Sequence, residues 1–101
     1  MADLYTVNKS PFEKNSLEQA IRFAGDGASI LLIEDGVYGA MAGTAAEGLI
    51  KGASGKKFYA LRSDVKARGI AEDRLIGGVE LVDYAGFVDL VEATDKVQAW
   101  L

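Results

Sequence analysis

Apolar and polar residues occur in blocks along the chain, and the most apolar block lies near the end of its first third. Ile30–Ile33 are all apolar, and the polar segment Glu34–Gly36 follows them directly. A short apolar run bounded by turn residues is typical of a strand buried on both faces, as in a parallel sheet. We therefore predict a strand over Ser29–Ile33 that ends at Glu34.

Shorter β-prone runs predict four further strands. Glycine, proline or polar residues bound them, as expected of strand ends. The predicted strands are Asp3–Val7, Phe58–Leu61, Val79–Val82 and Val97–Leu101.

Helical spacing fills the segments between these strands. Leu17, Ala20, Ile21 and Ala24 recur at i, i+3, i+4 and i+7, which forms one apolar stripe. A capping box, either Asn15 with Glu18 or Ser16 with Gln19, predicts the start of this helix. Further helical segments are expected near Val37, after a capping box of Thr44 with Glu47, in one or two turns capped at Ser63, and from Phe87 to Thr94.

Strands and helical segments thus alternate four times, which is typical of βαβ units. We predict an α/β fold with a mostly parallel five-stranded sheet, helices on both faces and right-handed crossovers. The expected strand order is the flavodoxin-like order 2-1-3-4-5. With 101 residues, the chain suits a single domain over residues 1–101.

Composition removes several kinds of chemistry. The chain has neither cysteine nor histidine, which excludes disulfides, thiolate and imidazole metal ligands, and Cys or His catalysis. The net charge of −4 and the scattered basic residues argue against direct nucleic-acid binding. No apolar stretch approaches the length of a membrane helix, and no signal peptide is visible. We expect a cytoplasmic chain that does not bind a membrane and has no metal or cofactor.

Polar clusters follow the first four predicted strands and should lie at one edge of the sheet. They are Asn8–Ser10, Glu34–Gly36, Arg62–Asp64 and Asp83–Tyr84. One hypothesis is a small-ligand or nucleotide site between strands 1 and 3, formed by Asn8, Lys9, Asp35 and Asp83. The alternative, which we favour for each cluster, is that these residues only cap helices and form turns.

Two of these clusters can be weighed further. Glu34 and Asp35 are adjacent, so their carboxylates should point apart and form a poor acid–base pair. Asp35 is better placed as a helix N-cap, with Gly36 allowing the chain to bend. Lys9 suits an anion near a helix start, but Asn8–Phe12 contains no glycine, which weakens a phosphate site.

Trp100 and the segment Asp83–Phe87 are aromatic features of the C-terminal part. Trp100 lies on the last predicted strand, where a large ring either closes the core or contacts another chain. Both alternatives stay open. Asp83–Phe87 is explained most simply by a helix cap followed by core aromatic residues.

Several stretches taken together resemble one family, the DsrH/TusB family of small sulfur-relay subunits. The resemblance covers nearly the whole chain, and its five parts occur in order. They are Thr6–Phe12, Leu31–Val37, Tyr59–Leu61 with Asp64–Gly69, Val82–Leu90 and Val97–Trp100.

This resemblance implies a DsrE-like fold and a heterohexamer with two copies each of this chain and of two paralogous subunits, DsrE/DsrF-like or TusD/TusC-like. Such complexes pass persulfide sulfur between cysteines, and a sulfur-carrier protein takes part. In the Tus branch the sulfur reaches the 2-position of the tRNA wobble uridine, and in the Dsr branch it enters sulfur oxidation. The residues of Asn8–Phe12 and Asp83–Phe87 are more similar to the Dsr branch. The sequence does not decide between the two branches.

One position departs from some members of the family. They carry a cysteine on the first helix, where this chain has Ala20. The resemblance therefore implies a subunit that holds no persulfide and is not an enzyme by itself, so no catalytic residue is assigned. The candidate interface or strand-end positions are Asn8, Lys9, Asp35, Gly36, Arg68, Asp83, Tyr84 and Trp100.

Overall fold

A single parallel sheet of five strands runs through the molecule. The computed structural model describes residues 3–53, 55–94 and 96–100. The strand order is β4-β3-β2-β1-β5, and every neighbouring pair is parallel. The strands are β1 (Asp3–Val7), β2 (Ser29–Leu32), β3 (Lys57–Leu61), β4 (Val79–Val82) and β5 (Lys96–Trp100).

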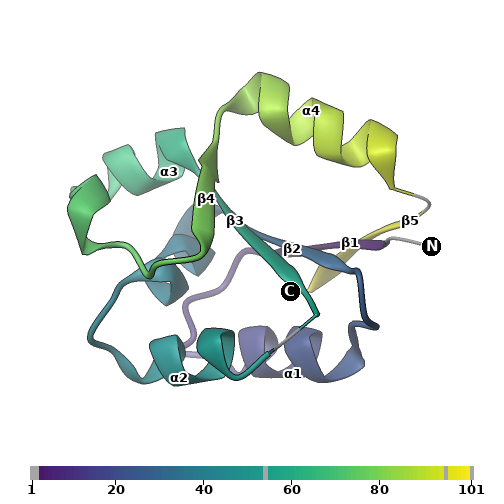
Figure 1. Cartoon of the computed structure of the whole chain (residues 1–101). Helices are drawn as coiled ribbons and strands as arrows, with labels where there is room; N and C mark the ends of the chain where they lie inside the picture. The colour runs from purple at the N-terminus through teal and green to yellow at the C-terminus, as the bar shows by residue number, and fades with distance from the viewer. Residues whose placement is uncertain (1–2, 54, 95, 101) are drawn as a thin grey trace.

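Helices lie on both faces of this sheet, with α1 and α2 below it and α4 above it in the view of Figure 1. The 3₁₀ helix η1 contacts both α2 and α3. The helices are α1 (Ser16–Phe23), η1 (Glu34–Ala40), α2 (Ala45–Lys51), α3 (Arg62–Ala67), η2 (Glu72–Arg74) and α4 (Tyr84–Ala93). None of the described helices is long and apolar enough to cross a membrane.

The larger hydrophobic core forms between the sheet and the helices α1, η1, α2 and α3. Alternate residues of the central strands point to this side, among them Val7, Ile30 and Leu32, all fully buried. Leu17 and Ala20 of the predicted α1 stripe complete it from the helix side. The opposite face buries Leu4 and Leu31, which do not belong to this cluster.

The predicted class, an α/β fold with a parallel sheet and helices on both faces, is confirmed. The flavodoxin-like strand order is wrong. That order places the second strand at an edge, whereas β2 lies between β1 and β3 and all four of its residues are buried. The first three crossovers each move to the adjacent strand in one direction, and only the connection through α4 returns to the other side of β1.

Most element positions agree with the sequence prediction, and the differences lie at their ends. β2 ends at Leu32, and the helix expected near Val37 is a 3₁₀ helix that begins at Glu34. α3 begins at Arg62, so Ser63 is not its cap. α4 begins at Tyr84, three residues before the predicted start. The last strand extends to Trp100, and its predicted final residue, Leu101, lies outside the described residues.

The predicted capping boxes form only in part. Asn15 occupies the N-cap position of α1 without a side-chain capping bond. Thr44 is the N-cap residue of α2, but its hydroxyl donates to the Met41 carbonyl instead of accepting from the helix. Glu47 accepts the N–H of Gly43 at 2.7 Å, one residue before the cap. This bond, together with Lys51 at 3.0 Å, lowers the pKa of the Glu47 carboxyl below its usual value.

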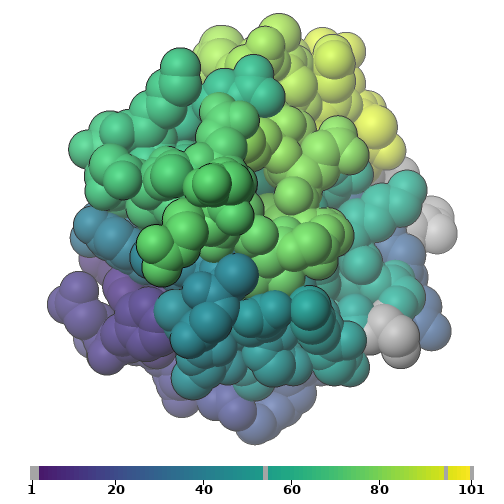
Figure 2. Space-filling view, turned by 60° about the vertical axis from the view of Figure 1, so that its left-hand side comes forward, coloured from purple at the N-terminus to yellow at the C-terminus, as the bar shows by residue number. Residues whose placement is uncertain are grey.

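The chain that precedes β4 is hydrogen-bonded to the end of η1 and the residues after it. The Ala42 N–H donates to the Arg74 carbonyl at 2.7 Å, and the Ile76 N–H donates to the Ala40 carbonyl at 2.8 Å. Figure 2 shows this green segment after α3 lying against the teal segment that contains η1 and α2. The chain around Ile76 therefore closes the core on the β4 side.

Candidate functional site

The polar clusters after β1 to β4 lie at one edge of the sheet, because all four strands are parallel. The crevice predicted between strands 1 and 3 does not form there, since β2 separates these strands. The clusters after β2 and β3 do contact one another through η1 and α3.

An ionic network joins η1 to α3 at this edge. Asp64 accepts the backbone N–H of Glu34 at 2.7 Å. Arg68 donates from Nε to Asp35 at 2.9 Å and lies 3.8 Å from the Asp64 carboxylate. The charges of Asp35, Asp64 and Arg68 are thus used within the chain. This arrangement fixes the position of α3 against the end of β2.

The interpretation of Asp35 as a helix N-cap is wrong. Ile33 occupies that position, and Asp35 is the second residue of η1. The carboxylate that accepts an N–H at the start of η1 comes from Asp64, thirty residues later. Glu34 has a positive φ of 50°, so the chain turns sharply as it leaves β2. Because of this turn, Asp35 lies inside η1 and not at its N-cap position.

Gly36 is required by a close backbone contact. A Cβ at this position would lie 2.0 Å from the Val7 carbonyl oxygen, well inside contact distance. That carbonyl also accepts the Ile33 N–H at 3.0 Å. Gly36 therefore allows η1 to cross directly over the end of β1, and the predicted bend at this residue has a steric cause.

Asn8 and Lys9 do not form an anion site with the other candidates. Lys9 is exposed, and no ion pair involves it among the described residues. Asn8 is half-buried, and its Oδ1 is buried without a hydrogen-bond partner in the described part of the chain. Asp35 pairs with Arg68, and Lys9 takes no part in that network.

Asp83 and Tyr84 have separate roles. Asp83 caps α4 by accepting the Gly86 N–H at 2.8 Å, as the cap alternative predicted. Tyr84 is 73% exposed, so its interpretation as a core aromatic residue is wrong. Its ring makes an edge contact with Phe87 at 6.1 Å between ring centroids.

Trp100 is part of a stack of three aromatic rings beside β5. Its ring centroid lies 6.4 Å from that of Tyr5 and 5.6 Å from that of Phe23. The ring thus packs on its own chain and is partly buried, while Phe23 covers it from the solvent side with 65% of its own surface exposed. Phe23 lies outside the apolar stripe of α1, so helical spacing in the sequence did not point to it.

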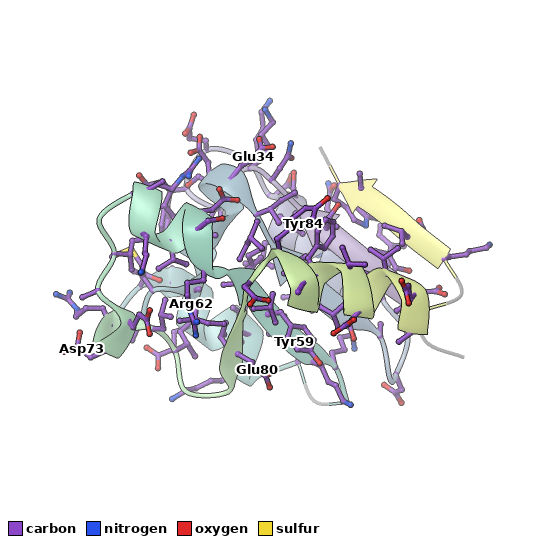
Figure 3. All side chains as sticks on the ribbon, turned by 90° about the horizontal axis from the view of Figure 1, so that it is seen from above. Glu34, Tyr59, Arg62, Asp73, Glu80 and Tyr84 are labelled. Atoms are coloured by element: carbon purple, nitrogen blue, oxygen red, sulfur yellow. The ribbon has the colours of Figure 1, made fainter. Side chains whose placement is uncertain are left out.

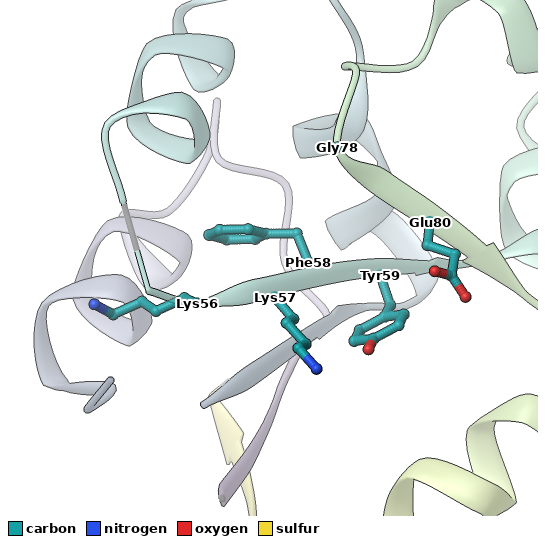
Figure 4. A pocket seen from close by; sticks show the side chains of 6 residues that line it. All are labelled: Lys56, Lys57, Phe58, Tyr59, Gly78 and Glu80. Atoms are coloured by element: carbon teal, nitrogen blue, oxygen red, sulfur yellow. The ribbon is translucent and has the colours of Figure 1, made fainter. Parts of the chain in front are cut away.

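A shallow hollow of about 270 Å³ lies at the opposite end of the sheet from the polar clusters. It is lined by residues at the beginnings of β3 and β4, namely Lys56, Lys57, Phe58, Tyr59, Gly78 and Glu80. Figure 4 shows Lys57 and Tyr59 pointing to one side of β3 and Phe58 to the other. No nucleophile–base pair lines this hollow, and its position does not match the predicted crevice.

The described residues contain no group of three or more acidic side chains placed to hold a metal ion. Some of their acids and bases form surface ion pairs, such as Arg62 with Glu72 at 3.7 Å. Figure 3 labels Arg62 on the ribbon. The chain has no cysteine or histidine, and several polar residues at the carboxyl ends of the strands form a cap and ion pairs. The fold thus defines a small parallel α/β domain.

Comparison with known proteins gives the family. Residues 9–97 match the family model described as DsrH like protein. Protein TusB of Sodalis glossinidius is 34% identical over 97 residues, which cover 96% of this chain and 99% of the relative. Protein TusB of Escherichia coli K12 is 31% identical with the same coverage. The chain belongs to the DsrH family, as the sequence resemblance indicated, and this membership supports a sulfur-relay subunit.

Solved structures share the fold. The ychN protein of Escherichia coli superposes with a TM-score of 0.80, covering 98% of this chain and 99% of that one, at 20% identity. Protein Tm0979 of Thermotoga maritima gives a TM-score of 0.68 at 30% identity, covering 91% of this chain and 92% of that one. The five-stranded order found here is therefore that of a known architecture, and the first likeness concerns the fold alone.

Proposed function

We propose that this chain is a non-catalytic subunit of a cytoplasmic complex that relays persulfide sulfur for 2-thiolation of the tRNA wobble uridine. The observation that carries the proposal is the match to the DsrH family over residues 9–97, together with relatives named Protein TusB over nearly the full length. The partners in this proposal are two paralogous subunits, TusC-like and TusD-like, and a sulfur-carrier protein.

Two properties of the chain support a role without its own sulfur chemistry. It has no cysteine, so it cannot form a persulfide. Ala20, the position where some family members carry a cysteine, is fully buried in the core beneath α1. Reactive thiols are partly exposed. The sulfur-accepting cysteine is therefore assigned to a partner subunit, and this chain contributes contact surface.

The Tus branch is favoured over sulfur oxidation by the names of the relatives. Both reported sequence relatives are Protein TusB, at 34% and 31% identity. The residues of Asn8–Phe12 and Asp83–Phe87 resemble the Dsr branch more closely. For Asp83–Phe87 there is a simpler explanation, because Asp83 caps α4.

Deletion of the gene in the source organism tests this function. The 2-thiouridine content of digested tRNA is measured by mass spectrometry in the parent strain, in the deletion strain, and in the deletion strain that carries the gene on a plasmid. We expect the thiolated nucleoside to disappear on deletion and to return with the plasmid. Normal thiolation in the deletion strain, with impaired oxidation of reduced sulfur, would assign the chain to the Dsr branch instead.

A small-ligand domain is the second hypothesis, and the structure gives it little support. Its four proposed residues do not converge, because Asp35 pairs with Arg68 and Asp83 caps α4. A thermal-shift screen with nucleotides and flavins checks it, since a ligand that binds only the native state raises the melting temperature. We expect no shift with either class of ligand.

A further inference from the structure

Large apolar side chains that remain exposed are concentrated around β5. In the described part of the chain, four of the six lie on α4 or on β5. Their exposed fractions are 73% for Tyr84, 37% for Val88, 36% for Val91 and 47% for Val97. We call these four residues the β5 surface. A cluster of exposed apolar residues of this kind marks an interaction site.

Helix α4 carries an apolar stripe that remains partly exposed. Tyr84, Val88 and Val91 recur at i, i+4 and i+7, so they lie along one side of the helix. No residue of α4 is fully buried, in contrast to α1, where Ser16, Leu17 and Ala20 are. Figure 3 shows α4 lying over the sheet, with Tyr84 at its first turn on the side where β5 runs.

Strand β5 continues the same surface onto an edge of the sheet. Among the described residues it pairs with β1 alone, and four of its five residues are exposed. Its backbone groups on the outer side therefore have no strand partner in the described chain. Edge strands are usually shielded by charges, proline or covering segments. β5 has a single charged residue, Lys96, at its beginning, and no proline.

The β5 surface is acidic along α4, and Lys96 of β5 is a single base beside it. Asp83, Asp89 and Glu92 lie on or next to α4, and that helix has no Lys or Arg. Like charges brought together across an interface oppose association, whereas opposite charges favour it. Two copies of this chain joined through α4 would bring their acidic rims together. Charge complementarity therefore selects a different protein with basic residues around an apolar centre.

We propose that the β5 surface binds a folded protein subunit whose contact area is apolar at its centre and rimmed by Lys and Arg. This rests on the proposed function, because the relay complex is what supplies such a subunit. Tyr84 and the valine stripe enter the apolar centre, and Asp89 and Glu92 pair with the basic rim. The polar edge around Asp35 and Arg68 takes no part.

The test compares two substitutions on this surface with one elsewhere. The full chain carrying both Tyr84→Ser and Val88→Ser is titrated against the purified pair of paralogous subunits, and the Kd is compared with that of the unmodified chain. Phe12→Ser is the matched control, because Phe12 is 56% exposed but lies in the loop after β1. We expect the double variant to bind at least about tenfold more weakly, as for buried interface anchors, and the control to bind normally.

Charge reversal is a second, independent test of the β5 surface. Asp89→Lys with Glu92→Lys replaces exposed acids only, so the fold should be kept even where the apolar variant melts early. Weaker binding by this variant, and weaker binding of the unmodified chain as salt rises, agree with a basic partner rim. Glu13→Lys, exposed in the loop before α1, is the control.

Three outcomes decide the matter. Unchanged Kd values for both the apolar and the charge-reversed variants overturn the proposal, even where deletion of the gene abolishes tRNA thiolation, so the proposed function then stands without it. A dimer of the chain alone in sedimentation experiments, lost on Tyr84→Ser with Val88→Ser, would identify a second copy as the occupant and also overturn it. Weakened binding by both variants with normal thiolation in the deletion strain would keep this surface and refute the proposed function.

Discussion

Strands β2 and β5 belong to the same parallel sheet, yet their surroundings are opposite. Every residue of β2 is buried, between β1 and β3 and beneath helices on both faces. Four of the five residues of β5 are exposed, and the one described neighbour of that strand is β1. The apolar residues of β2 are thus used by the chain's own core, while those around β5 remain available to another molecule.

The largest expected difference between the two strands is in stability. Leu32→Ala removes a fully buried side chain and should lower the free energy of unfolding by about 2–5 kcal/mol. Val97→Ala on β5 removes a side chain that is 47% exposed and should cost less than about 1 kcal/mol. Urea denaturation followed by circular dichroism measures both. Equal losses of unfolding free energy would contradict the distinction between a buried central strand and an exposed edge strand.

A second variant examines how tightly the chain is packed at the end of β2. Gly36→Ala places a methyl group against the Val7 carbonyl, and should cost about 1–3 kcal/mol because the backbone must shift. Gly25→Ala is the control, since a Cβ there meets no atom within 4 Å. Similar melting temperatures for the two variants would show that η1 does not cross β1 as closely as described.

The ionic network at the same end of the sheet should contribute less to the free energy of unfolding than Gly36 does. Within it, Asp64 should contribute more than Asp35. Asp64→Ala removes the acceptor of the Glu34 N–H, which should cost about 1 kcal/mol, as for a helix cap. Asp35→Ala breaks a pair with Arg68 whose carboxylate is 55% exposed, so its effect should be near 0–1 kcal/mol, as for surface ion pairs. A larger loss for Asp35→Ala than for Asp64→Ala would restore Asp35 as the main stabilising acid.

The smallest expected effect concerns a thiol introduced into the core. Ala20→Cys should leave the fold intact but remain nearly unreactive toward iodoacetamide, because the position is fully buried. Ala85→Cys, exposed on α4, is the control that should react rapidly. Mass spectrometry after timed alkylation measures both rates. Rapid labelling at residue 20 would show that the helix opens and that this position can serve sulfur transfer.

The local features of the fold were predictable from sequence, and the long-range ones were not. The strand Asp3–Val7 and the stripe of α1 follow from residue spacing alone, and both agree with the structure. The strand order depends on which strands become neighbours, which spacing does not encode. The uniformly apolar run Ile30–Leu32 did hold a usable signal, because such a strand belongs at the centre of a sheet.

The candidate positions also divide into local features, which were predictable, and long-range ones, which were not. The cap formed by Asp83 is local and was foreseen, whereas the cap at Glu34 comes from Asp64 across thirty residues. The partly exposed stripe of Tyr84, Val88 and Val91 has a helical spacing that the sequence contains. Whether such a stripe faces the core or the solvent depends on the packing of α4, which only the structure shows.

Transfer of radiolabelled sulfur through the reconstituted complex tests the central claim most directly. The two paralogous subunits are loaded with ³⁵S persulfide, with and without this chain, and label on the sulfur-carrier protein is measured after non-reducing electrophoresis. We predict that transfer requires this chain while the chain itself stays unlabelled, since it has no cysteine. Equal transfer in its absence would contradict the proposed role as a relay subunit.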